Sequence, residues 1–68
     1  MNWIKIDPGA ELPNVRPDAK SYSVEIILCF SDNTYSLGYY DFDVETFFNN
    51  EDISATPVAW SYFERYNG

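Results

Sequence analysis

The sequence predicts a mainly β protein, a small single-domain antiparallel sheet of about four to five strands that curls as a small barrel or sandwich. Three observations predict this fold class. With 68 residues, the chain suits one domain, residues 1–68, with a small core. Aromatic residues form 19% of it, and each large ring can bury roughly 150–250 Å². Several stretches alternate between apolar and polar residues, as strands do, with turn-forming residues between them.

The first expected strand is short and lies at residues 3–6, where Ile4 and Ile6 share one face. The following stretch, residues 7–20, contains three prolines and one glycine, which is typical of an irregular connection. A loop of this length is unusual in so small a domain. We therefore expect it to pack on the sheet through three apolar residues: Leu12, Pro13 and Val15.

The strongest strand pattern covers residues 22–30. One face of this strand is apolar or aromatic at every second position: Tyr22, Val24, Ile26, Leu28 and Phe30. The opposite face begins polar with Ser23 and Glu25 and becomes apolar at Ile27 and Cys29. This change predicts a central strand that is covered on both sides toward its end.

A hairpin is expected after this strand. Residues 31–34 form a compact polar turn, and residues 35–40 return as the partner strand. Gly38 lies inside that second strand, where a glycine marks either a bulge or the close approach of a neighbouring aromatic ring.

Residues 41–48 fit two local structures. With a period of two, the three acids of this run share one face of a strand. As a helix start, Asp43 is a good N-cap, and two phenylalanines make a hydrophobic staple: Phe42 and Phe47. We favour a strand at residues 45–48, and a short helical turn near 43–50 stays open as the alternative.

The chain is expected to turn at residues 49–52 and to form its last strand at residues 56–63. Three large side chains share one face of that strand: Val58, Trp60 and Tyr62. Pro57 near its start fits an edge position or a strand beginning. The resulting meander has to curl or fold over itself to bury aromatic residues from both of its faces.

The residue types argue against an enzyme. The chain has no His and a single cysteine, Cys29, which excludes Ser-His and Cys-His catalysis and zinc sites of the Cys/His type. Its three glycines are isolated, so it has no glycine-rich phosphate loop. Asp41, Asp43 and Glu45 lack the ligand count and the central glycine of a calcium loop. We therefore predict no catalytic, cofactor-binding or metal-binding residue.

The net charge of the chain is −7, with 11 Asp and Glu against 4 Lys and Arg. This balance argues against direct binding of nucleic acid or of an anionic membrane, since both need clustered bases. All four bases lie outside residues 21–64, which hold eight acids. Six of these acids are candidates for a partner-binding face: Asp32, Asp41, Asp43, Glu45, Glu51 and Asp52. The alternative is that the charge serves solubility alone.

Two Trp, six Tyr and five Phe are more rings than so small a core needs, and Tyr and Trp are favoured at protein interfaces. The aromatic candidates for partner binding beside the acids are Tyr39, Tyr40 and Tyr62, with Tyr66 further along. The alternative is that these tyrosines cover the open face of the sheet with their hydroxyl groups outward.

Cysteine usage and the first residues point to the cytoplasm. A secreted domain of this size usually carries several disulfides, and Cys29 has no partner in the chain. The first residues show neither a basic region nor an apolar run of signal length. No stretch approaches the ~20 apolar residues of a membrane span.

Six different short motifs follow one another along nearly the whole chain. They are Trp3-Ile4 with Ile6, Leu12-Pro13, Ile26-Ile27-Leu28, Gly38-Tyr39-Tyr40-Asp41, Phe47-Phe48 and Val58-Ala59-Trp60. This layout resembles a family of short bacterial and phage domains, the domain of unknown function 551. The resemblance implies a small β domain of a phage or mobile element, in the cytoplasm of a bacterial host cell. It brings no known catalytic residue with it.

Two functional hypotheses follow. The first is a non-enzymatic acidic module that binds a basic protein partner. Its sharpest form is an inhibitor that mimics nucleic-acid charge against a host defence or nucleic-acid-binding protein, of the anti-CRISPR or anti-restriction class. The second is a structural or accessory β domain that self-associates through its aromatic sheet face. A small-ligand pocket between Trp3, Trp60 and the tyrosines is a third option, and it lacks convergent polar groups.

Overall fold

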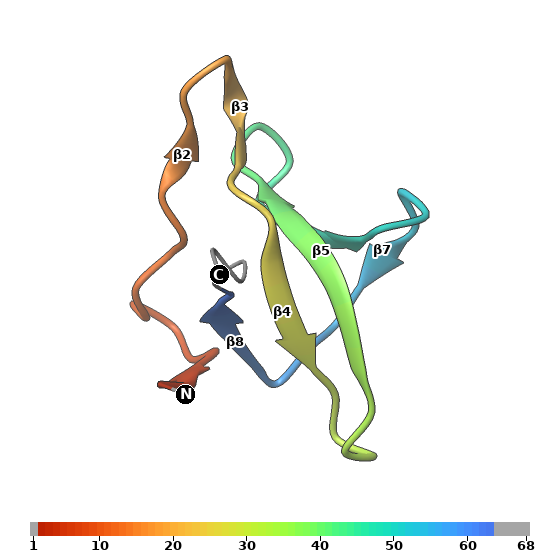
Figure 1. The fold of residues 1–68 in the computed structure, drawn as a ribbon. Coiled ribbons are helices and arrows are strands. Elements are labelled where there is room, and N and C mark those ends of the chain that lie inside the picture. The colour runs from red at the N-terminus through yellow and green to blue at the C-terminus, as the bar shows by residue number, and fades with distance from the viewer. Residues whose placement is uncertain (1, 64–68) are drawn as a thin grey trace, which may run out of the picture.

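The structure is a computed structural model that describes residues 2–63. Within these residues it is all β, with eight strands and no helix (Figure 1). The strands are β1 (Ile4–Lys5), β2 (Val15–Arg16), β3 (Ala19–Ser23), β4 (Ile26–Cys29), β5 (Tyr35–Asp41), β6 (Thr46–Asn49), β7 (Ser54–Ala55) and β8 (Ala59–Tyr62). All the pairings between them are antiparallel. The predicted fold class is confirmed, with more and shorter strands than expected.

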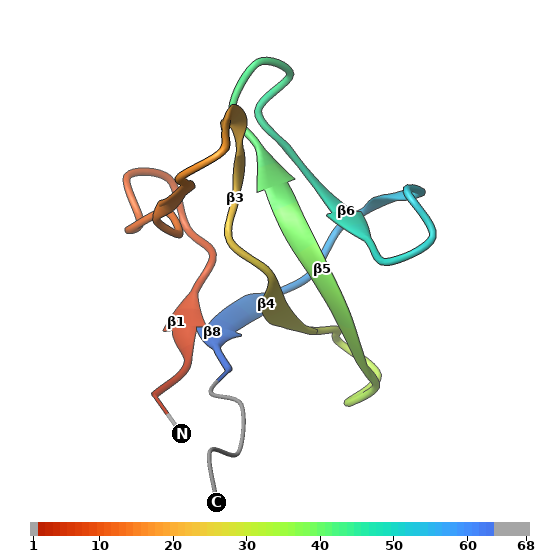
Figure 2. The ribbon, with the colours of Figure 1, turned by 45° about the horizontal axis from the view of Figure 1, so that its top comes forward.

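The sheet curls into a half-barrel around β5, its longest strand (Figures 1 and 2). One edge of β5 pairs with two strands: its first half pairs with β4 and its last residue with β3. Strand β2 pairs with β3 and extends the sheet on that side. On the far side of β4 lies β8, which carries β1. The other edge of β5 pairs with β6, and β6 carries β7. Strands β6 and β7 therefore form the opposite margin of the sheet from β1.

The strand predicted at residues 22–30 is wrong in one respect, because it breaks at residues 24–25 between β3 and β4. The break reverses the alternation, so that Tyr22 is 38% exposed and Ser23 is fully buried. Ser23 Oγ accepts a hydrogen bond from the Tyr40 backbone N at 2.8 Å and donates one to the Val24 oxygen at 2.8 Å. The Ser23 hydroxyl thus satisfies the Tyr40 backbone N–H in place of a backbone oxygen. The hydrophobic pattern of the sequence does not predict this hydrogen bond.

Strand β4 is the central strand, as predicted. It is paired on both edges, with β5 and with β8. Ile26 and Leu28 are fully buried on its inner face, and Ile27 and Cys29 are half-buried on the outer face. Both faces of this strand are therefore covered, although unequally.

The connection at residues 7–20 is irregular only in its first half, so the prediction is wrong for the second half. There β2 and β3 form a hairpin with Pro17 and Asp18 between the strands. A two-residue strand is too short to show an alternation in sequence. Of the three apolar residues expected to pack, only Pro13 is buried, while Leu12 and Val15 are 44% and 47% exposed.

The hairpin of β4 and β5 is confirmed, and Gly38 marks a close approach. A Cβ at this position would collide with the backbone oxygen of Phe48 and would lie 2.8 Å from Leu28 Cδ1. Gly38 pairs in continuous register with Ile26 on one edge and with Asn49 on the other, so there is no bulge. The neighbour that requires glycine is the backbone of β6 rather than the expected aromatic ring.

Between β5 and β6, residues 42–45 form a turn. The strand favoured here is confirmed to within one residue, and the helical alternative is not realised. Asp41 Oδ1 accepts hydrogen bonds from the backbone N of Asp43 at 2.9 Å and of Val44 at 3.4 Å. The capping residue is thus Asp41, whereas the helical alternative needed Asp43.

The strand expected at residues 56–63 begins later, as β8, because the chain first pairs β7 with β6. Pro57 is buried between the two strands, which fits the predicted strand beginning. Val58 then joins the sheet by donating its backbone N–H to the Cys29 oxygen at 2.8 Å and accepting from the Ile6 N at 2.9 Å.

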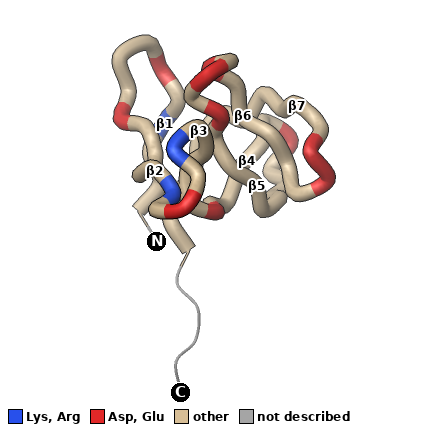
Figure 3. Tube along the Cα trace, turned by 90° about the horizontal axis from the view of Figure 1, so that it is seen from above, with Lys and Arg blue, Asp and Glu red and all other residues tan. Residues whose placement is uncertain are grey.

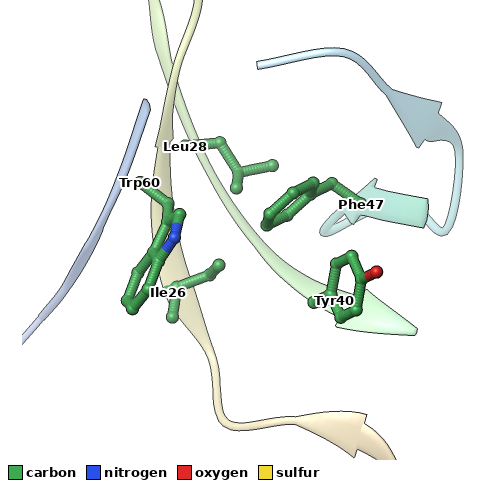
Figure 4. Close-up of a cluster of buried hydrophobic side chains, with 5 residues drawn as sticks. All are labelled: Ile26, Leu28, Tyr40, Phe47 and Trp60. Carbon is green, nitrogen blue, oxygen red and sulfur yellow. The ribbon is translucent and has the colours of Figure 1, made fainter. Parts of the chain in front are cut away.

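Five hydrophobic side chains form the core inside the curl (Figure 4): Ile26, Leu28, Tyr40, Phe47 and Trp60. The rings of Tyr40 and Phe47 meet edge to face with centroids 4.7 Å apart. The buried indole of Trp60 donates its Nε1–H to the Glu11 backbone oxygen at 3.2 Å. This bond ties the β1–β2 connection to the core and satisfies the polar end of the ring.

Candidate partner-binding surface

The six candidate acids lie in three turns and do not form one face (Figure 3). Asp32 belongs to the turn between β4 and β5. Because the seven residues of β5 rise ~3.4 Å each, this turn lies roughly 20 Å from Asp41 at the other end of the strand. Asp32 Oδ1 accepts from Thr34 Oγ1 at 2.6 Å and from Thr34 N at 3.1 Å, and these two bonds lower the pKa of its carboxyl. Asp32 therefore stabilises the β4–β5 turn, and it lies far from the other candidate acids.

The other five acids lie in two turns at the two ends of β6. Residues 42–45 follow Asp41 at the end of β5, and residues 50–53 join β6 to β7. We call the side chains of these turns the β6 corner: Asp41, Asp43, Val44, Glu45, Glu51, Asp52 and Ile53. The four-residue strand β6 separates the two groups of acids, and the members of the two groups that are nearest in sequence are Glu45 and Glu51.

The β6 corner combines charge with exposed apolar surface. Asp43, Glu45 and Glu51 are exposed, and Val44 and Ile53 are 59% and 57% exposed. Val44 thus stands between two acids and Ile53 directly follows two, so each turn offers a partner apolar surface beside charge.

Local hydrogen bonds fix the backbone of both turns. Asn49 Oδ1 accepts from the backbone N of Glu51 at 2.9 Å and of Ile53 at 3.1 Å, as Asp41 does in the other turn. Glu45 and Asp52 have left-handed backbone conformations, with φ of 52° and 61°. Since such conformations cost energy for residues with a side chain, they persist only where the surrounding structure holds them.

The bases of the described chain lie on other strands, and two of them are close to the β6 corner. Lys5, Arg16 and Lys20 belong to β1, β2 and β3, and residues 21–63 contain no Lys or Arg. The separation of charge along the sequence is therefore only partial in space, because Arg16 and Asp52 line the same pocket and the Phe42 backbone N donates to the oxygen of Ser21, the residue after Lys20.

Tyr39 is the predicted aromatic residue that lies beside these acids. Its hydroxyl donates to Asp52 Oδ1 at 2.9 Å, and its ring packs on Tyr22 and Phe48, with centroids 5.4 and 5.6 Å away. Arg16 lies over the Tyr39 ring at 5.9 Å. Burial, and then the bond to Asp52, raise the pKa of Tyr39 to about 12. The phenol thus stays neutral and holds the β6–β7 turn against β5.

The other two predicted tyrosines occupy different environments. Tyr40 is 7% exposed and belongs to the core, so its ring is not part of a surface patch. Tyr62 is half in solvent, packs edge to face on Trp60 at 4.8 Å, and accepts a hydrogen bond from Asn14 N at 3.0 Å. Of these three tyrosines, Tyr39 is the one that the structure shows hydrogen-bonded to a candidate acid. Tyr66 lies outside the described residues.

Sequence reasoning missed an apolar hollow of about 370 Å³ at one end of the half-barrel. Three separate segments line it: the β1–β2 connection through Leu12, β5 and β6 through Tyr40 and Phe47, and the chain after β7 through Pro57. Leu12 and Pro57 carried a weak signal, since both are apolar residues in otherwise polar connections. Leu12 and Pro57 come close together only because the sheet curls into a half-barrel.

Sites for metal or nucleophilic chemistry do not emerge from the described residues. Within residues 2–63, no group of three or more acids or cysteines is placed to hold a metal ion. Cys29 is half-buried on the outer face of β4, with Sγ 3.7 Å from the Phe30 oxygen. The same residues contain no helix with the length and apolar character that crossing a membrane requires.

Comparison with known proteins gives no relative from which a role can be transferred. No family model, no curated protein and no solved structure matches the chain.

Proposed function

We propose that this protein is a non-enzymatic module that binds a basic protein surface through the β6 corner. One observation carries the proposal: five carboxylates gather in two turns at the ends of one short strand, in a stretch of chain without Lys or Arg. Such a region attracts a positively charged partner and speeds their encounter. The exposed Val44 and Ile53 supply apolar contact between the charges.

The sharpest form of the proposal is an inhibitor of the anti-CRISPR or anti-restriction class, in which carboxylates occupy the groove that a basic host protein offers to nucleic acid. The two groups of acids at the ends of β6 support this form, because carboxylates, like phosphates, present negative charge to such a groove. The phage or mobile-element origin and the bacterial cytoplasm rest on the resemblance to the domain of unknown function 551.

A matched pair of charge reversals tests the proposal. Asp43 and Glu51 are exposed acids of the β6 corner, while Asp18 and Glu25 are exposed acids outside it. Both D43K/E51K and D18K/E25K change the net charge by the same amount, from −7 to −3. The immobilised proteins are compared for capture from a bacterial lysate, with salt elution and mass spectrometry.

We expect proteins that bind the wild type and D18K/E25K, elute at high salt and are lost with D43K/E51K. Loss of the same proteins with both variants would show that only net charge matters, which would contradict a site at the β6 corner. Asp41 and Asp52 are left intact, because they cap a turn and accept the Tyr39 hydrogen bond.

A second candidate, self-association, is favoured by the outer face of the sheet. There the rings of Trp3 and Tyr35 stack with centroids 5.8 Å apart, and Tyr35 is 63% exposed. Cys29 and Ala59 lie in register between Tyr35 and Lys5, so Lys5 is the single charged residue in this row. A dimer through this face should persist or tighten as salt rises, and Trp3→Ser should abolish it. A constant monomer mass by light scattering from low to high salt would rule it out.

A further inference from the structure

The apolar hollow has walls that are already fixed by the fold. Phe47 and Tyr40 belong to the core, and Pro57 is buried. Ala55 pairs with Phe47 across β6 and β7, and the Ile6 N–H donates to the Val58 oxygen at 2.9 Å. A ligand that enters the hollow therefore does not have to order these walls, which is a condition for useful affinity.

The hollow is apolar inside and acidic at its rim. Its walls are Ile6, Leu12, Tyr40, Phe47, Ala55 and Pro57, and Glu45 stands at the edge. Asp7 follows Ile6 and Glu11 precedes Leu12, so two further acids flank the lining residues in the chain.

Tyr40 lies in the wall of the hollow near two carboxylates. Its ring lines the wall, and Figure 4 shows its oxygen directed away from Ile26, Leu28 and Trp60. The pKa of Tyr40 is raised by burial and then by the carboxylates of Glu45 and Asp41. The nearest base in the chain, Lys5, lies in the outer-face row with Ala59 and Cys29, on the opposite side of the sheet from the core residue Trp60.

We propose that the hollow receives one apolar side chain of a partner segment in which Lys or Arg residues flank that side chain. The occupant follows from charge complementarity: the walls match an aliphatic group, and the acids at the rim match the flanking bases. The volume of about 370 Å³ is large enough to admit an aliphatic side chain. This inference rests on the proposed function and names the chemistry of the partner.

Three capped pentapeptides serve as probes, with ¹⁵N-labelled protein observed by NMR. Lys-Lys-Leu-Lys-Lys should bind with a Kd of roughly millimolar and shift the amide signals of Leu12, Thr46, Ala55 and Thr56. Lys-Lys-Ala-Lys-Lys should bind at least about tenfold more weakly, because it buries three fewer carbon atoms. Glu-Glu-Leu-Glu-Glu should not bind, since the rim repels it.

Two aromatic substitutions provide the matched protein variants. Thr56 is exposed and lines the hollow, so T56W should fill it and weaken the leucine peptide about tenfold without changing the charge. Tyr35 is exposed on the outer face, so Y35W should leave the affinity unchanged. Dispersed amide spectra of both variants establish that each is folded.

Equal affinity for the leucine and alanine peptides, with shifts confined to the β6 corner, would overturn the inference and leave the proposed function standing. Shifts at the hollow that depend on protein concentration alone would also overturn it, because a second copy would then be the occupant. Failure of the proposed function is recognised separately, by equal loss of captured proteins with D43K/E51K and D18K/E25K.

Discussion

Gly38 lies where two paired strands leave no room for a side chain. Gly38→Ala should lower the free energy of unfolding by at least about 2 kcal/mol, because the new Cβ would meet the Phe48 backbone and Leu28. Gly9→Ala is the matched control: Gly9 has a φ of 81° with no atom within 4 Å, so only backbone strain of about 1 kcal/mol is expected. Urea denaturation measures both. Equal losses would contradict the close approach of β6.

Tyr39 should show a pH dependence at alkaline pH. Its pKa is about 12 in the folded protein against 10.0 for an ordinary tyrosine, with burial the first cause and the Asp52 bond the second. The folded state therefore holds this proton longer than the unfolded state does. The contribution to stability is complete below pH 10 and is lost as the pH rises from about 10 to about 12.

Titration of the protein with base, followed by the ultraviolet absorbance of tyrosinate, tests the raised pKa of Tyr39. Asp52→Asn should move the late-titrating phenol toward 10 without reaching it, because burial remains. A Tyr39→Phe variant should lack that late step. Titration of the wild-type tyrosines in a single step near 10 would contradict the buried, hydrogen-bonded Tyr39.

At the scale of the element, the β6–β7 turn depends on one amide side chain. Asn49 Oδ1 accepts two backbone hydrogen bonds of this turn, while the neighbouring Asn50 is exposed. Asn49→Ala should lower stability by about 1 kcal/mol and Asn50→Ala by less than about 0.5 kcal/mol. Thermal denaturation of the two variants compares them. Equal effects would show that the turn does not need the Asn49 cap.

The individual strands also show where a sequence pattern is sufficient to predict the local structure. The β4–β5 hairpin was predictable because one long alternating run meets a polar turn and a second run. The break after Ser23 was not, because its cause is a hydrogen bond to Tyr40, seventeen positions further along the chain. Strands β2 and β7 have two residues each, which carry too little periodicity to be recognised.

At the scale of the whole molecule, a charge of −7 on 68 residues should make stability depend on salt. Raising ionic strength from 0.01 to 0.15 M shortens the Debye length from roughly 30 to about 8 Å, which screens repulsion among the acids. We expect a stabilisation on the order of 1 kcal/mol, or roughly 4–8 °C in Tm. D43K/E51K should show a smaller rise. An equal rise in both proteins would show that the β6 acids contribute no repulsion.

The candidate site was predicted in part. The sequence identified the acid-rich stretch, because charge and composition are properties of the chain alone. It placed them on one face, whereas Asp32 lies at the far end of β5 from the β6 corner. It counted Tyr40 as a surface residue, and the curl buries it against Phe47. Which side chains share a surface depends on strand pairing, and pairing joins residues that are distant in sequence.

The sequence by itself determined that this protein is one small antiparallel β domain with a strongly negative surface and a central strand at Ile26–Cys29. Length, aromatic content and alternation suffice for that, because burial has to follow the two-residue period of a strand. Only the tertiary structure decided the β6 corner, the core position of Tyr40 and the apolar hollow between Leu12 and Pro57. Each of these requires the closure of the sheet, which brings together segments that no local pattern connects.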